Sequence, residues 1–322
     1  DHWLPDHLEY FNLDADILPE IVWTTDIAGR ITQAGASLCG LAEGTPVIAG
    51  TNDAAAEALS AGVVAPGDMM MMYGSSHIYD LVVDQYIRSE KYLTRRLNIP
   101  HRFGLGGGLA TAGSLTAWFK NQFGGPEVLA EQQGGPDAYQ ALAQLADQSP
   151  IGANGLILLP YFSGARNPVF DGDAVGTWFG LNLTHTRADM YRAVLEAIGF
   201  GIRHCLEQFD DDNLSALQTY AIGGGVRNPV WTQIVSDICN IRQHIPVEKI
   251  GACYGDAFLA GYGIGMFENI TDIKKWVRIQ DTILPDPKAH EAYLPFYKIY
   301  RDLYPANKDL MYRLSSIQKK IN

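Results

Sequence analysis

The chain has 322 residues, which is too long for one compact core and fits two lobes. Hydrophobic residues make up 47% of it and charged residues 19%, a composition typical of a well-packed globular enzyme and unlike that of a disordered chain. With 24 Lys and Arg against 36 Asp and Glu, the formal net charge is −12, which repels phosphate backbones and anionic lipid. We therefore expect no nucleic-acid partner and no membrane partner.

Four cysteines, at positions 39, 205, 239 and 253, are scattered without any C-x-x-C pair. This spacing argues against a zinc site and against a disulfide framework, so we expect four reduced thiols. No apolar run approaches the roughly 18 residues that span a bilayer, and no signal peptide is recognisable, so the predicted location is cytoplasmic.

Residues 46–62 predict a strand, a tight turn and a helix, the unit that places functional groups at the edge of an α/β sheet. The apolar run 47–49 is expected to be a buried strand, and the Ala-rich run after Asp53 predicts a helix that ends at Gly62. Asp53 is the leading candidate for chemistry, because a carboxylate at a helix N-terminus suits a base that accepts a hydroxyl proton in phosphoryl transfer. The alternative is that Asp53 only caps its helix.

Residues 69–83 predict a β-hairpin. Two apolar segments, 69–73 and 78–83, flank the sequence Gly-Ser-Ser-His at 74–77. The turn offers backbone amides and two hydroxyls, a neutral cradle for phosphate oxygens. Small residues are also ordinary in a hairpin turn, so both interpretations stay open for this segment.

Strands and helices alternate through the rest of the chain, which predicts an α/β fold with a nucleotide-binding layout. In chain order the predicted elements are a glycine-rich loop (104–108) before a helix over 114–123, a surface helix over 127–147, a buried strand at 155–159, a helix from 187 to 206, a strand ending at 222, a helix from 229, a helix around 251–263 and two C-terminal helices separated by Pro305. Thr186 and Asp189 form the signature of a capping box.

Three glycine turns lie at these junctions, at Gly74, at Gly113 and at 223–225. The second and third precede predicted helices, whose N-terminal amides bind phosphate. One such turn is more often a tight turn than a site. Three of them in an acidic chain indicate a nucleotide held through main-chain groups. The chain has neither a G-x-x-x-x-G-K-[ST] phosphate loop nor a G-x-G-x-x-G register.

The loop after residue 159 carries Arg166, Asp171 and Asp173, which either border a sugar site or form a solvated, salt-bridged loop. The eight histidines are dispersed without metal-ligand spacing, and no serine lies in a G-x-S-x-G frame. Neither a metal centre nor a hydrolase triad is therefore supported.

Residues 176–196 carry the most specific pattern in the chain. They read GTWFGLNLTHTRADMYRAVLE and closely resemble the second signature of the FGGY carbohydrate kinases in the glycines, the spacing to Asp189 and the closing Ala-Val-Leu-Glu. The resemblance runs from about residue 18 to the C-terminus and is greatest to xylulose kinase and its close relatives. Further segments match this family in the same order, at 50–53, 73–76, 112–114, 159–161, 223–228 and 254–257.

The resemblance implies an actin-like ATPase fold, with two RNase H-type lobes that close on ATP, Mg²⁺ and a small sugar. It implies that Asp53 is the catalytic base that deprotonates the sugar hydroxyl. Ser75 falls where the nucleotide phosphates are contacted, Gly113 where ribose and phosphate are approached, and Gly224 and Asn228 in the adenine and ribose pocket. The nucleotide-binding residues implied for this chain are Gly74, Ser75, Ser76, Gly113, Gly224, Gly225 and Asn228.

Nothing in the chain resembles the Asp-x-Gly-Thr loop that opens the family's first lobe and holds phosphate and magnesium. We therefore expect residues 1–52 to be the tail of that N-terminal, sugar-binding lobe, and 53–322 to be the C-terminal, nucleotide-binding lobe. The predicted function is ATP-dependent phosphorylation of a hydroxyl of a sugar or polyol, a pentulose such as xylulose, with this chain alone incomplete and inactive. The alternative is a non-catalytic, actin-like nucleotide-binding or interaction module. No magnesium ligand is assigned, and a homodimer is left open.

Overall fold

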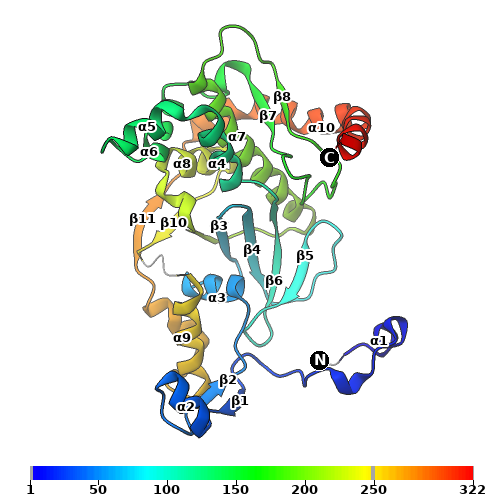
Figure 1. The fold of residues 1–322 in the computed structure, drawn as a ribbon, viewed down its shortest axis with the longest axis vertical. Coiled ribbons are helices and arrows are strands. Elements are labelled where there is room, and N and C mark those ends of the chain that lie inside the picture. Colours follow the sequence, from blue (N-terminus) through cyan, green and yellow to red (C-terminus); the bar gives the residue numbers. More distant parts are fainter. Residues whose placement is uncertain (1–2, 248–250, 322) are drawn as a thin grey trace.

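The computed structural model describes residues 3–247 and 251–321, and Figure 1 shows their arrangement. A seven-stranded mixed sheet lies at the centre, in the order β11-β10-β9-β3-β4-β6-β5. Its strands are β3 (Asp68–Tyr73), β4 (His77–Val83), β5 (Leu93–Arg96), β6 (Phe103–Leu109), β9 (Gln218–Ile222), β10 (Gln243–Pro246) and β11 (Ile279–Ile283). Two smaller sheets pair β1 (Ile27–Arg30) with β2 (Pro46–Ile48) and β7 (Ile157–Leu159) with β8 (Thr177–Phe179). The α-helices in the described ranges are α1 (Pro5–Phe11), α2 (Gln33–Cys39), α3 (Asp53–Ser60), α4 (Gly113–Phe123), α5 (Gly125–Gln132), α6 (Ala138–Asp147), α7 (Arg187–Leu206), α8 (Pro229–Cys239), α9 (Gly251–Gly263) and α10 (Pro287–Ile321).

Three adjacent strands of the central sheet run parallel. β3 pairs with β9 and β9 with β10 in the same direction, whereas the other neighbours in this sheet are antiparallel. The carboxyl ends of the three parallel strands therefore meet at one edge, where ligands bind in open α/β sheets. The predicted hairpin is confirmed, because Tyr73 at the end of β3 pairs with His77 at the start of β4.

Side chains of β3 alternate between two helical layers, as successive residues of a strand must. Met69 and Met71 pack into the main core with residues of α4, α7, α8 and α10. Met70 packs on the opposite face against Ala58 of α3. Figure 1 shows α3 and α9 on one side of the sheet and α4, α7 and α8 on the other. The predicted capping box at the start of α7 is confirmed.

The glycine-rich run at 104–108 is strand β6, between β4 and β5, and the prediction of a loop is wrong. Its glycines leave room for side chains of the neighbouring strand. A Cβ at Gly104 would lie 2.5 Å from Asp80 Oδ1, and a Cβ at Gly107 would overlap the Tyr79 hydroxyl. Glycine in a strand often marks such a close approach, but the partner that requires it is distant in sequence.

Two further predictions are wrong in part. The single surface helix over 127–147 is instead α5 and α6, separated at Gly134, whose φ of +86° ends a helical turn. α6 does not lie only on the surface, because its Leu142 and Ala146 side chains are fully buried in the main core. Strand β2 forms as predicted but is not buried, since it pairs with β1 alone and Val47 is 42% exposed.

The two predicted C-terminal helices are one helix, α10, which continues through Pro295 and Pro305. Proline removes a backbone donor and usually kinks or ends a helix. Tertiary packing outweighs that cost here, because Phe200 of α7 packs against three buried tyrosines of α10, at 293, 297 and 300. Neither α10 nor any other helix in the described ranges is both long and apolar enough to cross a membrane.

The loop after β7 binds the second half of α10. The Tyr304 hydroxyl donates to Asp171 at 2.5 Å, and the Ser315 hydroxyl donates to Asp173 at 2.7 Å. Lys319 also pairs with Asp173. These contacts favour the salt-bridged loop over a sugar site for the two carboxylates.

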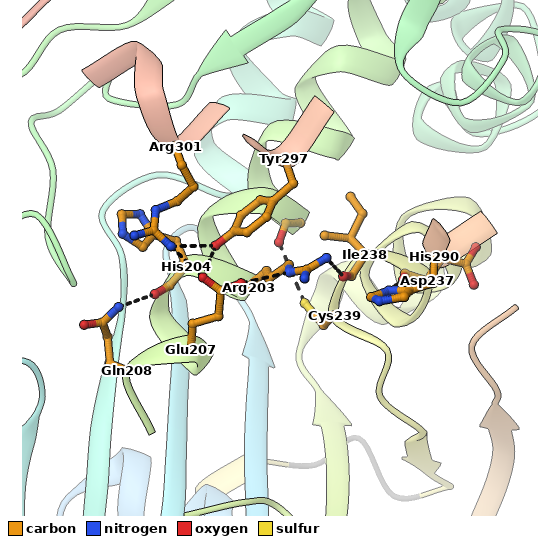
Figure 2. Close-up of polar contacts among 11 residues, drawn as sticks. Arg203, His204, Glu207, Gln208, Asp237, Ile238, Cys239, His290, Tyr297 and Arg301 are labelled. Atoms are coloured by element: carbon orange, nitrogen blue, oxygen red, sulfur yellow. Dashed lines mark hydrogen bonds and ion pairs between the residues drawn. The ribbon is translucent and has the colours of Figure 1, made fainter. Parts of the chain in front are cut away.

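Glu207 ties α10 to the end of α7, as Figure 2 shows. Its Oε1 accepts from Arg203 Nε at 3.1 Å, and its Oε2 accepts from the Tyr297 hydroxyl at 2.6 Å and from Arg301 Nη1 at 2.5 Å. The Arg203 guanidinium lies 4.4 Å from the centre of the Tyr297 ring and donates to the Ile238 carbonyl in α8 at 3.1 Å. One carboxylate thus holds a network that joins three helices.

We expect Glu207→Gln to lower the free energy of unfolding by about 1–3 kcal/mol, because it leaves two partly buried guanidinium groups without their shared negative charge. Urea denaturation measures this effect. Glu291→Gln, on an exposed position of α10, is the matched control and should change stability by less than about 0.5 kcal/mol. Equal losses for the two variants would contradict the role given to Glu207.

Candidate functional site

The hairpin tip after β3 and the N-terminus of α4 form one unit. The Gly74 carbonyl accepts a hydrogen bond from the Gly113 amide at 2.9 Å. The Ser75 carbonyl accepts from the amides of Ala112 and Ser114, both at 2.9 Å. Two of the three predicted glycine turns are therefore brought together.

The absence of a side chain at Gly113 has a direct structural reason. A Cβ there would lie 2.5 Å from the Gly74 carbonyl oxygen and 3.5 Å from Ser75 Cα. The Gly113 amide is already bonded to that carbonyl. Close packing on the hairpin therefore explains this glycine without a ligand, and its contact with a nucleotide stays a prediction.

The third turn, at 223–225, lies against the same strand end. Gly223 has a φ of +93°, and a Cβ on it would lie 2.8 Å from the Tyr73 carbonyl oxygen. A Cβ on Gly225 would lie 2.5 Å from the Trp231 ring. Gly224 differs, because a Cβ there would meet no heavy atom within 4 Å. Gly224 is thus the glycine of this turn with open space beside its backbone.

Asn228 caps α8, as predicted. Its side-chain oxygen accepts from the Trp231 amide at 3.0 Å, and Pro229 is the first residue of the helix. This bond uses one of the two lone pairs of the side-chain oxygen, so the other lone pair and the amide nitrogen are the groups with which Asn228 could contact adenine or ribose. That contact stays a prediction.

A cavity of about 260 Å³ opens beside Gly74, at the carboxyl ends of β3, β9 and β10. Most of its wall is apolar, and its polar side chains are Glu57 and Ser60 of α3. An apolar wall with a few polar groups suits a small organic ligand such as a nucleotide. The exposed Ser75 and the half-buried Ser76 follow Gly74 at the hairpin tip. The lining residues are Glu57, Ser60, Ala61, Met72, Gly74, Ala221, Ile222, Gly223, Val226, Ile245, Pro246 and Gly251.

Asp53 is the first residue of α3 but does not cap it. The cap is Asn52, whose side-chain oxygen accepts from the Ala55 amide at 2.9 Å. The Asp53 carboxylate is exposed and accepts from the adjacent Ala54 amide at 2.8 Å. The alternative in which Asp53 caps its helix is therefore wrong. Its role as a base stays a prediction.

Glu57 lies on the cavity wall, although no motif in the sequence marks it as a site residue. It follows Asp53 by four residues, so the two carboxylates project from the same face of α3. Partial burial and then the negative charge of Asp53 raise the pKa of Glu57. Asp53 is thus electrostatically coupled to a residue of the cavity, and the four-residue spacing was the signal available in the sequence.

The described residues do not provide a metal centre. They contain no group of three or more His, Cys, Asp or Glu side chains arranged to hold a cation, and all four cysteines are free thiols. Mg²⁺ at a phosphoryl-transfer site usually keeps several waters and is bound by one or two carboxylates together with substrate phosphates, so a bound nucleotide would have to supply part of its coordination. Mg²⁺ therefore stays a prediction that rests on the family resemblance.

Solved structures place the fold in the class of sugar kinases with an actin-like ATPase fold, and specifically match their C-terminal lobe. The xylulose kinase from Rhodospirillum rubrum has a TM-score of 0.83 and is 30% identical, over 96% of this chain and 61% of its own. The predicted fold class is confirmed.

Residues 69–264 match the FGGY family of carbohydrate kinases, C-terminal domain, and the chain belongs to this family, whose members use ATP. The Bacillus subtilis xylulose kinase is 29% identical over 321 residues, which are 98% of this chain and 62% of that protein. The Escherichia coli autoinducer-2 kinase is 29% identical over 306 residues, 91% of this chain and 56% of that protein. The chain thus spans about 60% of the length of the first of these relatives.

A buried histidine follows the hairpin tip. His77 is fully buried at the start of β4, and its ring lies edge-on to Tyr73 at 5.5 Å between centres. Neither ring nitrogen has a hydrogen-bond partner within the described part of the chain. Burial lowers the pKa of His77 to about 3. Below about pH 6.5 the unfolded chain binds a proton at this residue that the folded chain does not bind until about pH 3, so acid weakens the fold.

We expect the free energy of unfolding of wild type to fall by about 1–2 kcal/mol between pH 7 and pH 5 because of His77, and we expect His77→Leu to lack this fall, since leucine binds no proton. Urea unfolding of wild type and variant at both pH values measures the difference. His7→Leu, at an exposed histidine of α1, is the control and should leave the pH dependence within about 0.5 kcal/mol of wild type. An unchanged pH dependence in His77→Leu would show that His77 is not held neutral by the fold.

Proposed function

We propose that this chain is the nucleotide-binding lobe of an ATP-dependent kinase that phosphorylates a hydroxyl of a sugar or polyol. The observation that carries the proposal is the convergence of the hairpin tip, the N-terminus of α4 and the 223–225 turn beside one cavity. Asp53 supports it as well, because it begins the helix that forms another wall of that cavity. The family gives the reaction class, phosphoryl transfer to a carbohydrate.

Under this proposal Asp53 accepts the proton of the substrate hydroxyl while the hydroxyl oxygen attacks the γ-phosphorus of ATP. The bond from the γ-phosphorus to the β–γ bridging oxygen breaks, and ADP leaves with that oxygen. An exposed carboxylate at a helix start can reach a ligand in this way, and general-base catalysis is worth about two to four powers of ten in rate. The amides and hydroxyls at 74–76 hold phosphate oxygens, and Gly113 approaches ribose and phosphate. The turn from Gly224 through Gly225 to Asn228 holds adenine and ribose. Mg²⁺ belongs to the reaction class, and no step is assigned to it on these residues.

The proposed substrate is a pentulose such as xylulose. Its support is the similarity to xylulose kinases along nearly the whole chain, although an autoinducer-2 kinase is as similar in identity. We further propose that residues 1–52 close the first, sugar-binding lobe, that 53–322 form the second, and that the enzyme is cytoplasmic. Turnover of ATP by the complete enzyme with a panel of pentuloses, other sugars and polyols tests the substrate. Turnover that no sugar or polyol stimulates would favour a non-catalytic nucleotide-binding module.

We expect residues 1–322 alone to bind ADP weakly and to show no sugar phosphorylation, because this chain without the first lobe would not hold the phosphoryl donor and the sugar acceptor in line.

Gly224→Ala should raise the Kd for ADP about tenfold, since the added methyl group fills open space beside the backbone without straining the fold. Gly125→Ala, at another glycine with open space that begins a helix, is the matched control and should leave the Kd unchanged. Calorimetric titration measures both, and equal affinities would place the nucleotide away from Gly224.

In the complete enzyme we expect Asp53→Asn to lower kcat by about two to four powers of ten while nucleotide affinity is retained. The amide keeps the shape of the side chain but cannot accept the proton. Steady-state kinetics and ADP titration separate the two effects, and Asp309→Asn on the exposed face of α10 controls for a loss of surface charge. Full activity of Asp53→Asn would exclude it as the base.

A further inference from the structure

Helices α3 and α9 cross unusually closely next to the cavity. A Cβ at Gly255 of α9 would overlap the carbonyl oxygen of Ala56, and a Cβ at Gly251 would lie 2.7 Å from Glu57 Oε1. Two glycines of α9 therefore allow its first turn to lie directly on the backbone and side chains of α3. At Gly255 the neighbour is the backbone of Ala56, so this contact transmits displacement, because neither helix can yield there without backbone movement.

A single hydroxyl joins the two helices at this crossing. Ser60 Oγ accepts a hydrogen bond from the Gly255 amide at 2.8 Å, and it lies 2.8 Å from the carbonyl oxygens of both Gly251 and Ala56, to which it can donate. In a regular α-helix the amide of residue 255 pairs with the carbonyl of residue 251. The Ser60 hydroxyl thus bonds to the two groups that form the first turn of α9.

Ser60, Glu57 and Gly251 all line the cavity, so the crossing forms part of its wall. A ligand in the cavity would therefore lie against the first turn of α9 and against Glu57 and Ser60 of α3. Asp53 lies seven residues before Ser60 on the same eight-residue helix, about 10 Å along its axis. Because a helix this short moves as a rigid rod, a shift at Ser60 also moves Asp53.

We propose that Ser60 is a positioning residue: it locks the first turn of α9 onto α3 and thereby couples occupancy of the cavity to the placement of Asp53. This inference rests on the proposed function, in which Asp53 is the base and the cavity receives the nucleotide. A misplacement of about 1 Å remote from the reacting atoms can lower a rate by up to about a hundredfold. The hydroxyl is therefore expected to affect turnover more than binding.

The first test is Ser60→Ala in the complete enzyme. Without the hydroxyl, the Gly255 amide and the Gly251 carbonyl can pair directly, so the fold is expected to survive with Tm changed by only a few degrees. We expect kcat to fall about 10- to 100-fold, with KM for nucleotide and sugar within about threefold of wild type. Ser37→Ala is the matched control, because Ser37 makes the same bond to a carbonyl four residues earlier but is exposed on α2. An unchanged kcat in Ser60→Ala overturns the inference.

The second test measures coupling without turnover. Amide hydrogen exchange in the complete enzyme should show that ADP protects both 53–57 and 251–255 in wild type, but protects only one of these segments in Ser60→Ala. Equal protection of both segments in the variant overturns the inference and leaves the proposed function standing. Wild type that shows no protection by ADP anywhere overturns the proposed function, and the inference with it. Ser60→Cys, which hydrogen-bonds only weakly, is measured in the same way if the alanine variant does not fold.

Discussion

At the end of β3, two glycines of neighbouring segments lie so close to the hairpin backbone that a side chain would not fit at either position. The Gly74 carbonyl bonds to the Gly113 amide, and the Tyr73 carbonyl lies against Gly223. A methyl group at either glycine would push α4 or the turn after β9 away from the hairpin tip. The site depends on this packing, because it is what brings three turns to the edge where the parallel strands end. Among the glycines of these three turns, Gly224 is the one at which a Cβ would meet no heavy atom within 4 Å.

Local signals in the sequence predicted much of this fold. The hairpin over 69–83, the cap at Asn228 and the helix that starts after Thr186 each depend on residues within a few positions of one another. The errors have non-local causes. Strand β6 is glycine-rich because Asp80 and Tyr79 of the adjacent strand occupy the space beside its glycines, one on each face of the sheet. Helix α10 continues through its prolines because it packs on α7, and no local pattern contains that information.

The candidate site was predictable in part for the same reason. The glycine turns and Asp53 can be read from short motifs, but the cavity joins residues from positions 57 to 251 and exists only in the folded chain. Asn52 and Asp53 are both good capping residues, so the sequence alone could not decide which of them capped α3, whereas one hydrogen bond to the Ala55 amide decides it. Ser60 gave no signal, because two of its three hydrogen-bond partners, Gly251 and Gly255, lie on α9, almost 200 residues away.

The segment that carries the family resemblance, 176–196, contributes no lining residue to the cavity. It builds a buried polar network instead. Burial opposes ionisation of Asp189, but hydrogen bonds from three surrounding residues outweigh it and lower the pKa to about 2. Further along α7, Arg192 pairs with Glu196 at 2.7 Å and donates to Tyr293 of α10 at 2.8 Å, and loss of one partner from such a buried pair costs about 3–5 kcal/mol. The polar contacts of this segment thus stabilise the packing of α7 and α10 and do not line the cavity.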